Sequence, residues 1–217
     1  FATTSANVET ALQARAFTAD GTRVLFPTVT WTSLSGALAV AADGKASATV
    51  PGVYRAVAQV NDARDTATVA VLGSASLLST AFAGGAILAD ARAGDLVDVP
   101  VTLDMSRAST TGDLGSLQLE LRFDPAVFSF ESHTAGARGA VDVFSPSAGV
   151  VRVAFAETAP QGAGQFTLVT LRLRVAAGAA AGTRTAMTLL YTANPTSTGF
   201  AAYSAPVSVA GRVRVVP

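Results

Sequence analysis

Residues 119–132 read LELRFDPAVFSFES, and this stretch shows most clearly what the chain builds. Every second residue from Leu117 to Phe123 is apolar, and successive side chains in a strand point to opposite faces, so these residues predict a strand with one buried face. The Asp124-Pro125 pair ends that strand, and a second short strand is expected over 127–131. The alternate polar side chains are expected to face solvent: Gln118, Glu120 and Arg122.

The composition excludes several classes of function. Half of the 217 residues are hydrophobic but only 7% are aromatic, so small and branched side chains must fill the core. The formal net charge is zero and the basic residues are scattered, which argues against a nucleic-acid-binding surface. There is no Cys for disulfides or thiolate metal sites. No run reaches the roughly 18–20 apolar residues of a membrane helix, so no membrane span is expected.

Alternating segments recur along the whole chain, separated by Gly, Pro, Asp and Asn, which is typical of β-sandwiches. Around residues 73–94 the composition shifts to Ser, Ala and Gly, so we place a domain boundary there and expect domains over 1–73 and 74–217. The expected strands of the first domain are 10–19, 28–32, 37–41, 46–50, 53–61 and 66–72. Those of the second are 77–82, 96–104, 117–123, 127–131, 140–144, 150–156, 165–175, 185–192 and 207–216.

The first domain resembles the bacterial immunoglobulin-like (Big) family. The resemblance lies in ARAFTADGTRV, TVTWTSLSGALAVAADGKASATVPGVYRAVAQV and DTATVAVLG, with their D-G, D-G-K and P-G turns and their T-W core strand. It implies an immunoglobulin-like sandwich. Trp31 is expected in its core, because a tryptophan supplies a large area to bury among Ala and Val; a platform for stacking a sugar ring is the alternative.

The second domain resembles the cohesin family and its carbohydrate-binding relatives. The landmarks are AGDLVDVPVTL, GSLQLELRFDPAVFSFES, GVVRVAFAE and GAGQFTLVTLRLRVAAGAAAGT, in that order. The resemblance implies a jelly-roll-like sandwich of nine strands, and hence an all-β chain of two tandem β-sandwiches. Cohesin-type sandwiches hold dockerins in cellulosome scaffolds, and they also occur in surface proteins and fibres, so the fold alone does not define the function.

Catalytic and metal-binding patterns are weak in this sequence. The only histidine, His133, lies in a Gly- and Ala-rich stretch without a nucleophile elbow. Glu120, Glu131 and Glu157 qualify as glycosidase carboxylates by residue type alone. Asp90, Asp95, Asp98, Asp104 and Asp113 do not form a calcium-binding loop. We therefore expect a protein that is not an enzyme and has no cofactor and no metal.

The polar face of the opening strand is the first candidate binding surface. In the cohesin pattern its neighbours would be 150–156 and 140–144, which add Arg152 and Asp142 to that face. The resemblance thus implies a candidate partner-binding face of mixed charge and without aromatic residues: Gln118, Glu120, Arg122, Asp142 and Arg152. Ordinary solvation of an antiparallel sheet would produce the same pattern.

Two other surfaces are alternatives. The terminal segments FATTSANVETALQARAF and SVAGRVRVVP alternate, so an unpaired strand there could complete the sheet of a neighbouring copy in a fibre or surface layer. Carbohydrate binding usually needs exposed aromatic side chains, and residues 191–206 offer Tyr191, Phe200 and Tyr203 as a candidate glycan-contact loop.

The sequence therefore predicts an extracellular or cell-surface bacterial protein segment that acts in scaffolding, adhesion or assembly. Its expected partner is another protein, either a dockerin-like module or a copy of itself, with a polysaccharide as the alternative. The chain starts at Phe1 with neither Met nor a basic leader, so we expect a processed product or a piece of a longer protein.

Overall fold

A computed structural model describes residues 2–18, 22–73, 77–79, 88–106, 114–159, 164–197 and 207–217. All regular secondary structure over these residues is β-strand, which confirms the all-β fold class. The chain divides into two compact units, Phe1–Gly73 and Ser74–Pro217. Each unit has its own buried cluster, and no residue belongs to both clusters.

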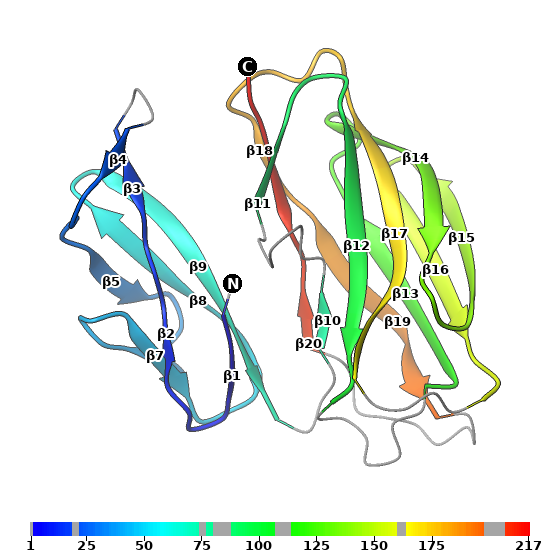
Figure 1. Cartoon of the computed structure of the whole chain (residues 1–217), viewed down its shortest axis with the longest axis horizontal. Helices are drawn as coiled ribbons and strands as arrows, with labels where there is room; N and C mark the ends of the chain where they lie inside the picture. The colour runs from blue at the N-terminus through cyan, green and yellow to red at the C-terminus, as the bar shows by residue number, and fades with distance from the viewer. Residues whose placement is uncertain are drawn as a thin grey trace. The chain divides into compact units, whose positions relative to one another are not determined.

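The first unit contains two principal sheets (Figure 1). One has the order β1-β9-β8-β5 and the other the order β2-β7-β6, while β3 and β4 form a separate pair. The strands are β1 (Ala2–Ser5), β2 (Thr10–Ala11), β3 (Ala16–Phe17), β4 (Arg23–Val24), β5 (Thr30–Ser33), β6 (Leu38–Val40), β7 (Lys45–Ala48), β8 (Gly52–Val60) and β9 (Ala63–Leu72).

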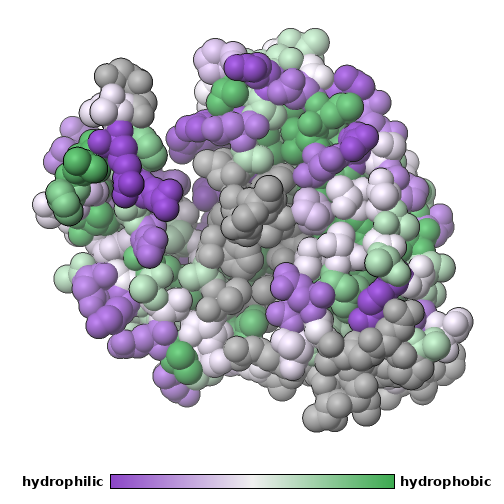
Figure 2. Space-filling view, in the orientation of Figure 1, coloured by the Kyte–Doolittle hydropathy of each residue, from purple (hydrophilic) through white to green (hydrophobic). Residues whose placement is uncertain are grey.

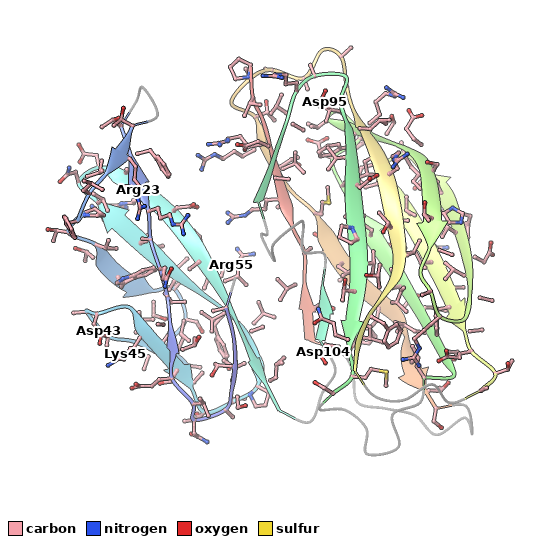
Figure 3. All side chains as sticks on the ribbon, in the orientation of Figure 1. Arg23, Asp43, Lys45, Arg55, Asp95 and Asp104 are labelled. Atoms are coloured by element: carbon pink, nitrogen blue, oxygen red, sulfur yellow. The ribbon has the colours of Figure 1, made fainter. Side chains whose placement is uncertain are left out.

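Small and branched side chains fill the core of the first unit, as its composition predicts. Trp31 is half-buried and packs against this core, which confirms its expected role. The turn before β7 approaches Trp31 closely: a Cβ on Gly44 would lie 2.9 Å from the indole nitrogen, and Gly44 has a φ of +83°. At the same turn Lys45 forms an ion pair of 3.0 Å with Asp43 (Figure 3).

The second unit has three sheets, and Figure 1 shows its two larger sheets as layers. Their orders are β14-β17-β12-β10-β20 and β15-β16-β13-β19, and the smallest sheet is β11-β21-β18. The strands are β10 (Leu77–Ser79), β11 (Leu88–Ala91), β12 (Leu96–Asp104), β13 (Ser116–Arg122), β14 (Phe128–Ala135), β15 (Ala140–Ser147), β16 (Val150–Ala156), β17 (Gln165–Val175), β18 (Arg184–Ala186), β19 (Thr188–Thr196), β20 (Val207–Val209) and β21 (Arg212–Val215).

The described part of this unit has twelve strands, β10 to β21, where the sequence predicted nine. One strand, β11, falls within residues 73–94, where the sequence predicted a strand only over 77–82. Two predicted strands are each divided because the chain changes sheets, at Met187 between β18 and β19 and at Ala210-Gly211 between β20 and β21. The N–H of Met187 donates to the carbonyl of Gly211 at 3.0 Å, so the two crossing points are joined.

The opening stretch builds the core as predicted. Leu117, Leu119, Leu121 and Phe123 are all buried. At the corner the carbonyl of Asp124 accepts hydrogen bonds from the N–H groups of residues 127 and 128, and its Oδ1 accepts one from the N–H of residue 126. Phe123 packs edge-on against the ring of residue 128, with 6.2 Å between ring centroids.

The strands at the two ends of the chain pair within their own units, so over the described residues neither end is a wholly unpaired strand. At the N-terminus β1 pairs in parallel with β9. At the C-terminus β20 pairs with β10, and β21 lies in the centre of its sheet between β11 and β18. Only one side of β1 and of β20 remains as a sheet edge.

Candidate partner-binding face

The candidate face is the outer side of the sheet β15-β16-β13-β19. Strand β13 pairs with β16 on one side and with β19 on the other, and β15 pairs with the far side of β16. Alternate residues of these strands point into the core, among them Leu119 on β13 and Val153 on β16. The remaining residues point outward, and they include all five predicted contact residues: Gln118, Glu120, Arg122, Asp142 and Arg152.

Glu120 lies on this face but is not exposed, so the prediction that it faces solvent was wrong. Its side chain is only 4% exposed because two arginine side chains cover it. Arg122, two residues along the same strand, donates from Nε to Oε1. Arg152, directly opposite on β16, donates from Nε to Oε2 at 3.0 Å. Hydrogen bonds from Arg122 and then Arg152 lower the pKa of Glu120 below its ordinary value, against the opposing effect of burial.

An apolar residue lies at each end of the same cross-strand row. The register places Phe144 of β15 beside Arg152, then Glu120, then Leu190 of β19. Phe144 is 47% exposed and Leu190 is 38% exposed. The prediction of a face without aromatic residues was therefore wrong, and alternation from Asp142 could have placed Phe144 on it.

The next row along the sheet is polar and more exposed. Asp142 of β15 lies opposite Ala154 of β16, which lies opposite Gln118 of β13. Asp142 and Gln118 are both exposed. Further along, Ser116 and Thr196 join β13 to β19 through their hydroxyl groups at 2.8 Å. The face therefore combines charged, amide, small and apolar side chains.

Of the three candidate glycan-contact residues, the described part of the chain contains Tyr191 alone. Tyr191 lies within strand β19, in register with Leu119, and is partly exposed. Phe200 and Tyr203 lie outside the described residues.

The remaining carboxylates that we considered for catalysis form ion pairs with arginines. Glu157 is buried, and its carboxylate accepts hydrogen bonds from Nε and Nη2 of Arg138 at 3.2 and 2.7 Å. The same guanidinium lies 4.0 Å from the centroid of the Phe166 ring. Glu131 pairs with Arg174 at 2.7 Å on strand β17. His133 is exposed on β14. Among the described residues no group of three or more His, Asp or Glu side chains could hold a metal ion.

The outer side of the opposite sheet carries an exposed arginine pair of a different geometry. Figure 2 shows hydrophilic residues mixed with hydrophobic ones on the side of β12 and β17. There Arg172 binds Asp98 through both Nε and Nη2, at 2.7 and 3.0 Å. Both side chains are about half exposed, as is Leu96 on the same strand as Asp98. Pairs of this kind contribute little to stability.

The described residues of the second unit thus define a β-sandwich module with a broad sheet face, on which two arginines hold the buried Glu120. The family model of the cohesin domain matches residues 88–215, which is more than half of the chain. The chain therefore belongs to the cohesin family, whose members are non-catalytic protein–protein interaction modules.

Solved cohesin structures share the fold. A non-cellulosomal cohesin from the archaeon Archaeoglobus fulgidus is 18% identical, with a TM-score of 0.52 over 66% of this chain and 92% of that chain. The OlpA cohesin of Clostridium thermocellum, in complex with dockerin Doc918, is 14% identical, with a TM-score of 0.53 over 65% and 99%. The third ScaC cohesin of Acetivibrio cellulolyticus, in complex with the ScaB dockerin, is 16% identical, with a TM-score of 0.51 over 65% and 99%.

No curated protein matches the chain significantly. Within the described residues there is no helix with the length and apolar character to cross a membrane.

Proposed function

We propose that the chain is part of an extracellular or cell-surface scaffold, in which the cohesin unit binds a dockerin-like module of another protein. The binding surface is the outer face of the sheet β15-β16-β13-β19. The observation that carries this proposal is the row from Phe144 to Leu190, where two exposed apolar side chains flank a charged centre. Interfaces commonly combine an apolar contact with arginine in this way.

The strands at both edges of this sheet favour docking onto its face over the addition of a strand. Strand β15 contains Pro146, at an irregularity in its pairing with β16, and strand β19 contains Pro195. Proline has no N–H to donate to a neighbouring strand, so it blunts a sheet edge. We therefore place the partner on the face.

The first unit serves as an immunoglobulin-like spacer in this proposal. Its two principal sheets have four and three strands, and several neighbours in them, such as β5 and β8 or β2 and β7, are not consecutive in sequence. Seven strands divided in this way, with such connections, are typical of immunoglobulin-like sandwiches. A spacer would hold the cohesin unit at a distance from its point of attachment.

Binding of dockerin modules from the source organism to the whole chain tests the proposal. We expect at least one module to bind, and binding to be lost in Phe144→Asp and Leu190→Asp variants whose thermal unfolding is unchanged. Leu96→Asp is the matched control, because Leu96 is similarly exposed on the outer side of the opposite sheet. Binding that survives both face substitutions would contradict the proposed surface. Protease treatment of intact cells tests the extracellular location.

A further inference from the structure

We propose that Arg122 and Arg152 form a two-arginine clamp that receives a carboxylate of the docking partner, with Glu120 as the residue that positions both guanidinium groups. The partner would present an Asp or Glu side chain with apolar side chains beside it. This inference rests on the proposed function, because it names the chemistry of the partner at the same face.

The clamp differs from the side-on arginine pairs among the described residues of this unit in how its donors are used. Arg138, Arg172 and Arg214 each bind one carboxylate side-on through Nε and Nη2. Arg122 and Arg152 instead share a single carboxylate, and each uses only Nε. A guanidinium has five N–H donors in a fixed planar fork. Within the part of the chain that the structure describes, the Nη groups of both arginines have no partner.

The side chains are placed so that these donors reach the surface. Arg122 is 58% exposed and Arg152 is 51% exposed, whereas the carboxylate between them is 4% exposed. Anchoring Nε on a buried acceptor restrains the position of each guanidinium, since the group is rigid. A partner carboxylate would then meet donors that have already lost part of their freedom, which lowers the entropic cost of binding.

The local charge favours an anionic group. Two guanidinium groups face one carboxylate, which leaves one positive charge in excess at the centre of the face. Asp142, the other predicted acidic residue of this face, is exposed in the neighbouring row, and no ion pair joins it to either arginine. Paired N–H groups of arginine match the geometry of a carboxylate.

The apolar neighbours limit what kind of carboxylate fits. Phe144 and Leu190 lie at the two ends of the row that contains Arg152 and Glu120. A docked surface that covers them would exclude water from the guanidinium groups and strengthen the ion pair. The acidic residue of the partner should therefore lie between apolar residues, as on one side of an amphipathic helix.

The test is a selection on the whole 217-residue chain. The probe is a display library of the ScaB dockerin with randomised positions in its C-terminal helix, the segment that carries a mutation in the solved complex with the ScaC cohesin. We expect enrichment of Asp or Glu at one position with apolar residues near it. In the selected binder, Asp→Asn or Glu→Gln at that position should weaken binding about 10–100-fold, the range for a hydrogen bond to a charged group.

Variants of the chain distinguish specific binding of a carboxylate by the two arginines from nonspecific electrostatic attraction of an acidic partner. Arg122→Gln and Arg152→Gln should each weaken the acidic binder about 10–100-fold and remove its preference for acid over amide. Arg172→Gln is the matched control, because this arginine is also paired and about half exposed but lies on the opposite sheet. It should leave binding unchanged. Thermal unfolding of each variant shows that the unit remains folded.

Glu120→Gln gives the decisive readout. If Glu120 acted only through its charge, its removal would strengthen the binding of an acidic partner. A positioning role predicts the opposite, because both guanidinium groups lose their ionic anchor, and the acidic binder should then bind more weakly. Tighter binding in this variant would overturn the positioning role.

The outcomes also distinguish this inference from the proposed function. Binders that are lost in Phe144→Asp and Leu190→Asp, but show no acidic enrichment and tolerate Arg122→Gln and Arg152→Gln, would overturn the clamp and leave the docking face intact. Binders that tolerate all four substitutions would overturn both. A selection without any binder would count against the proposed function itself.

Discussion

Glu120 and Arg152 lie directly opposite each other on strands β13 and β16, and Nε of Arg152 donates to Oε2 of Glu120 at 3.0 Å. Arg122, two residues further along β13, holds the other oxygen. The carboxylate is therefore enclosed from its own strand and from the next one. The arrangement keeps an ionised group beneath the surface of an otherwise solvated sheet face, where it affects stability.

This enclosure predicts a change in stability with pH. The folded state lowers the pKa of Glu120 below the ordinary glutamate value of 4.5, chiefly through Arg122 and then Arg152. As pH falls, the unfolded chain therefore takes up the proton first, so the stabilisation present above about pH 4.5 is lost as pH falls through the folded pKa. In Glu120→Gln the free energy of unfolding should fall less steeply between pH 5 and 3.

Denaturant unfolding of the wild type and of Glu120→Gln at several pH values measures this difference. Asp90 and Asp98 also have lowered pKa values, because of Arg214 and Arg172 respectively, so both proteins retain some acid sensitivity. Only the difference between the two slopes reports on Glu120. Equal slopes would show that its two arginines do not favour the ionised form.

The sequence predicted which face of the opening strand is buried, but not how deep its polar residues lie. Alternation assigns a side chain to one side of a sheet, whereas its exposure depends on the neighbouring strands. Glu120 is covered because β16 places Arg152 opposite it, and this pairing joins residues 32 positions apart. Likewise, strand β11 was missed because its partner β21 comes about 120 residues later in the chain.

The points at which the chain crosses from one sheet to another could not be predicted from the local sequence pattern either. Apolar and other residues alternate without interruption over residues 207–216, and this pattern predicts a single strand. In the structure β20 and β21 belong to different sheets. The change occurs at Gly211, whose carbonyl accepts the N–H of Met187 from the other crossing. Only the tertiary pairing reveals such a change.

A second prediction concerns the buried pair of Arg138 and Glu157. Arg138→Met removes both hydrogen bonds to Glu157 and the contact of the guanidinium with the Phe166 ring. Because it leaves a buried carboxylate without its counter-ion, the unfolding free energy should fall by about 3–5 kcal/mol. Arg172→Met breaks an exposed pair of the same geometry and should cost at most about 1 kcal/mol. Urea unfolding compares the two; similar losses would contradict the role of burial.

A third prediction concerns the division of the chain. The buried cluster of the second unit consists of residues from Ala91 to Val215, and that of the first unit consists of residues from Leu12 to Val71. Neither core needs a side chain from the other. We therefore expect a fragment of residues 74–217 to unfold cooperatively by itself, as seen by circular dichroism and calorimetry. A fragment without a cooperative transition would show that the first unit is required for folding.

The last prediction tests the corner that ends the opening strand. Gly149 and Gly94 both have φ values in the left-handed region, +79° and +86°. A Cβ on Gly94 would meet nothing within 4 Å, so Gly94→Ala should cost only the backbone strain, about 1–2 kcal/mol. A Cβ on Gly149 would lie 2.6 Å from the carbonyl oxygen of Phe123 and 3.0 Å from Cδ of Pro125.

Gly149→Ala must therefore also move the backbone of the corner, and this movement weakens the bond from the N–H of Phe123 to the carbonyl of Gly149, now 2.9 Å long. We expect a total loss of about 2–5 kcal/mol, the sum of strain and overpacking. Since both variants introduce the same methyl group at a similar φ, the difference between their unfolding free energies measures the contact between the Asp124-Pro125 corner and the turn before β16. If the two variants are equally stable, that contact does not hold the corner in place.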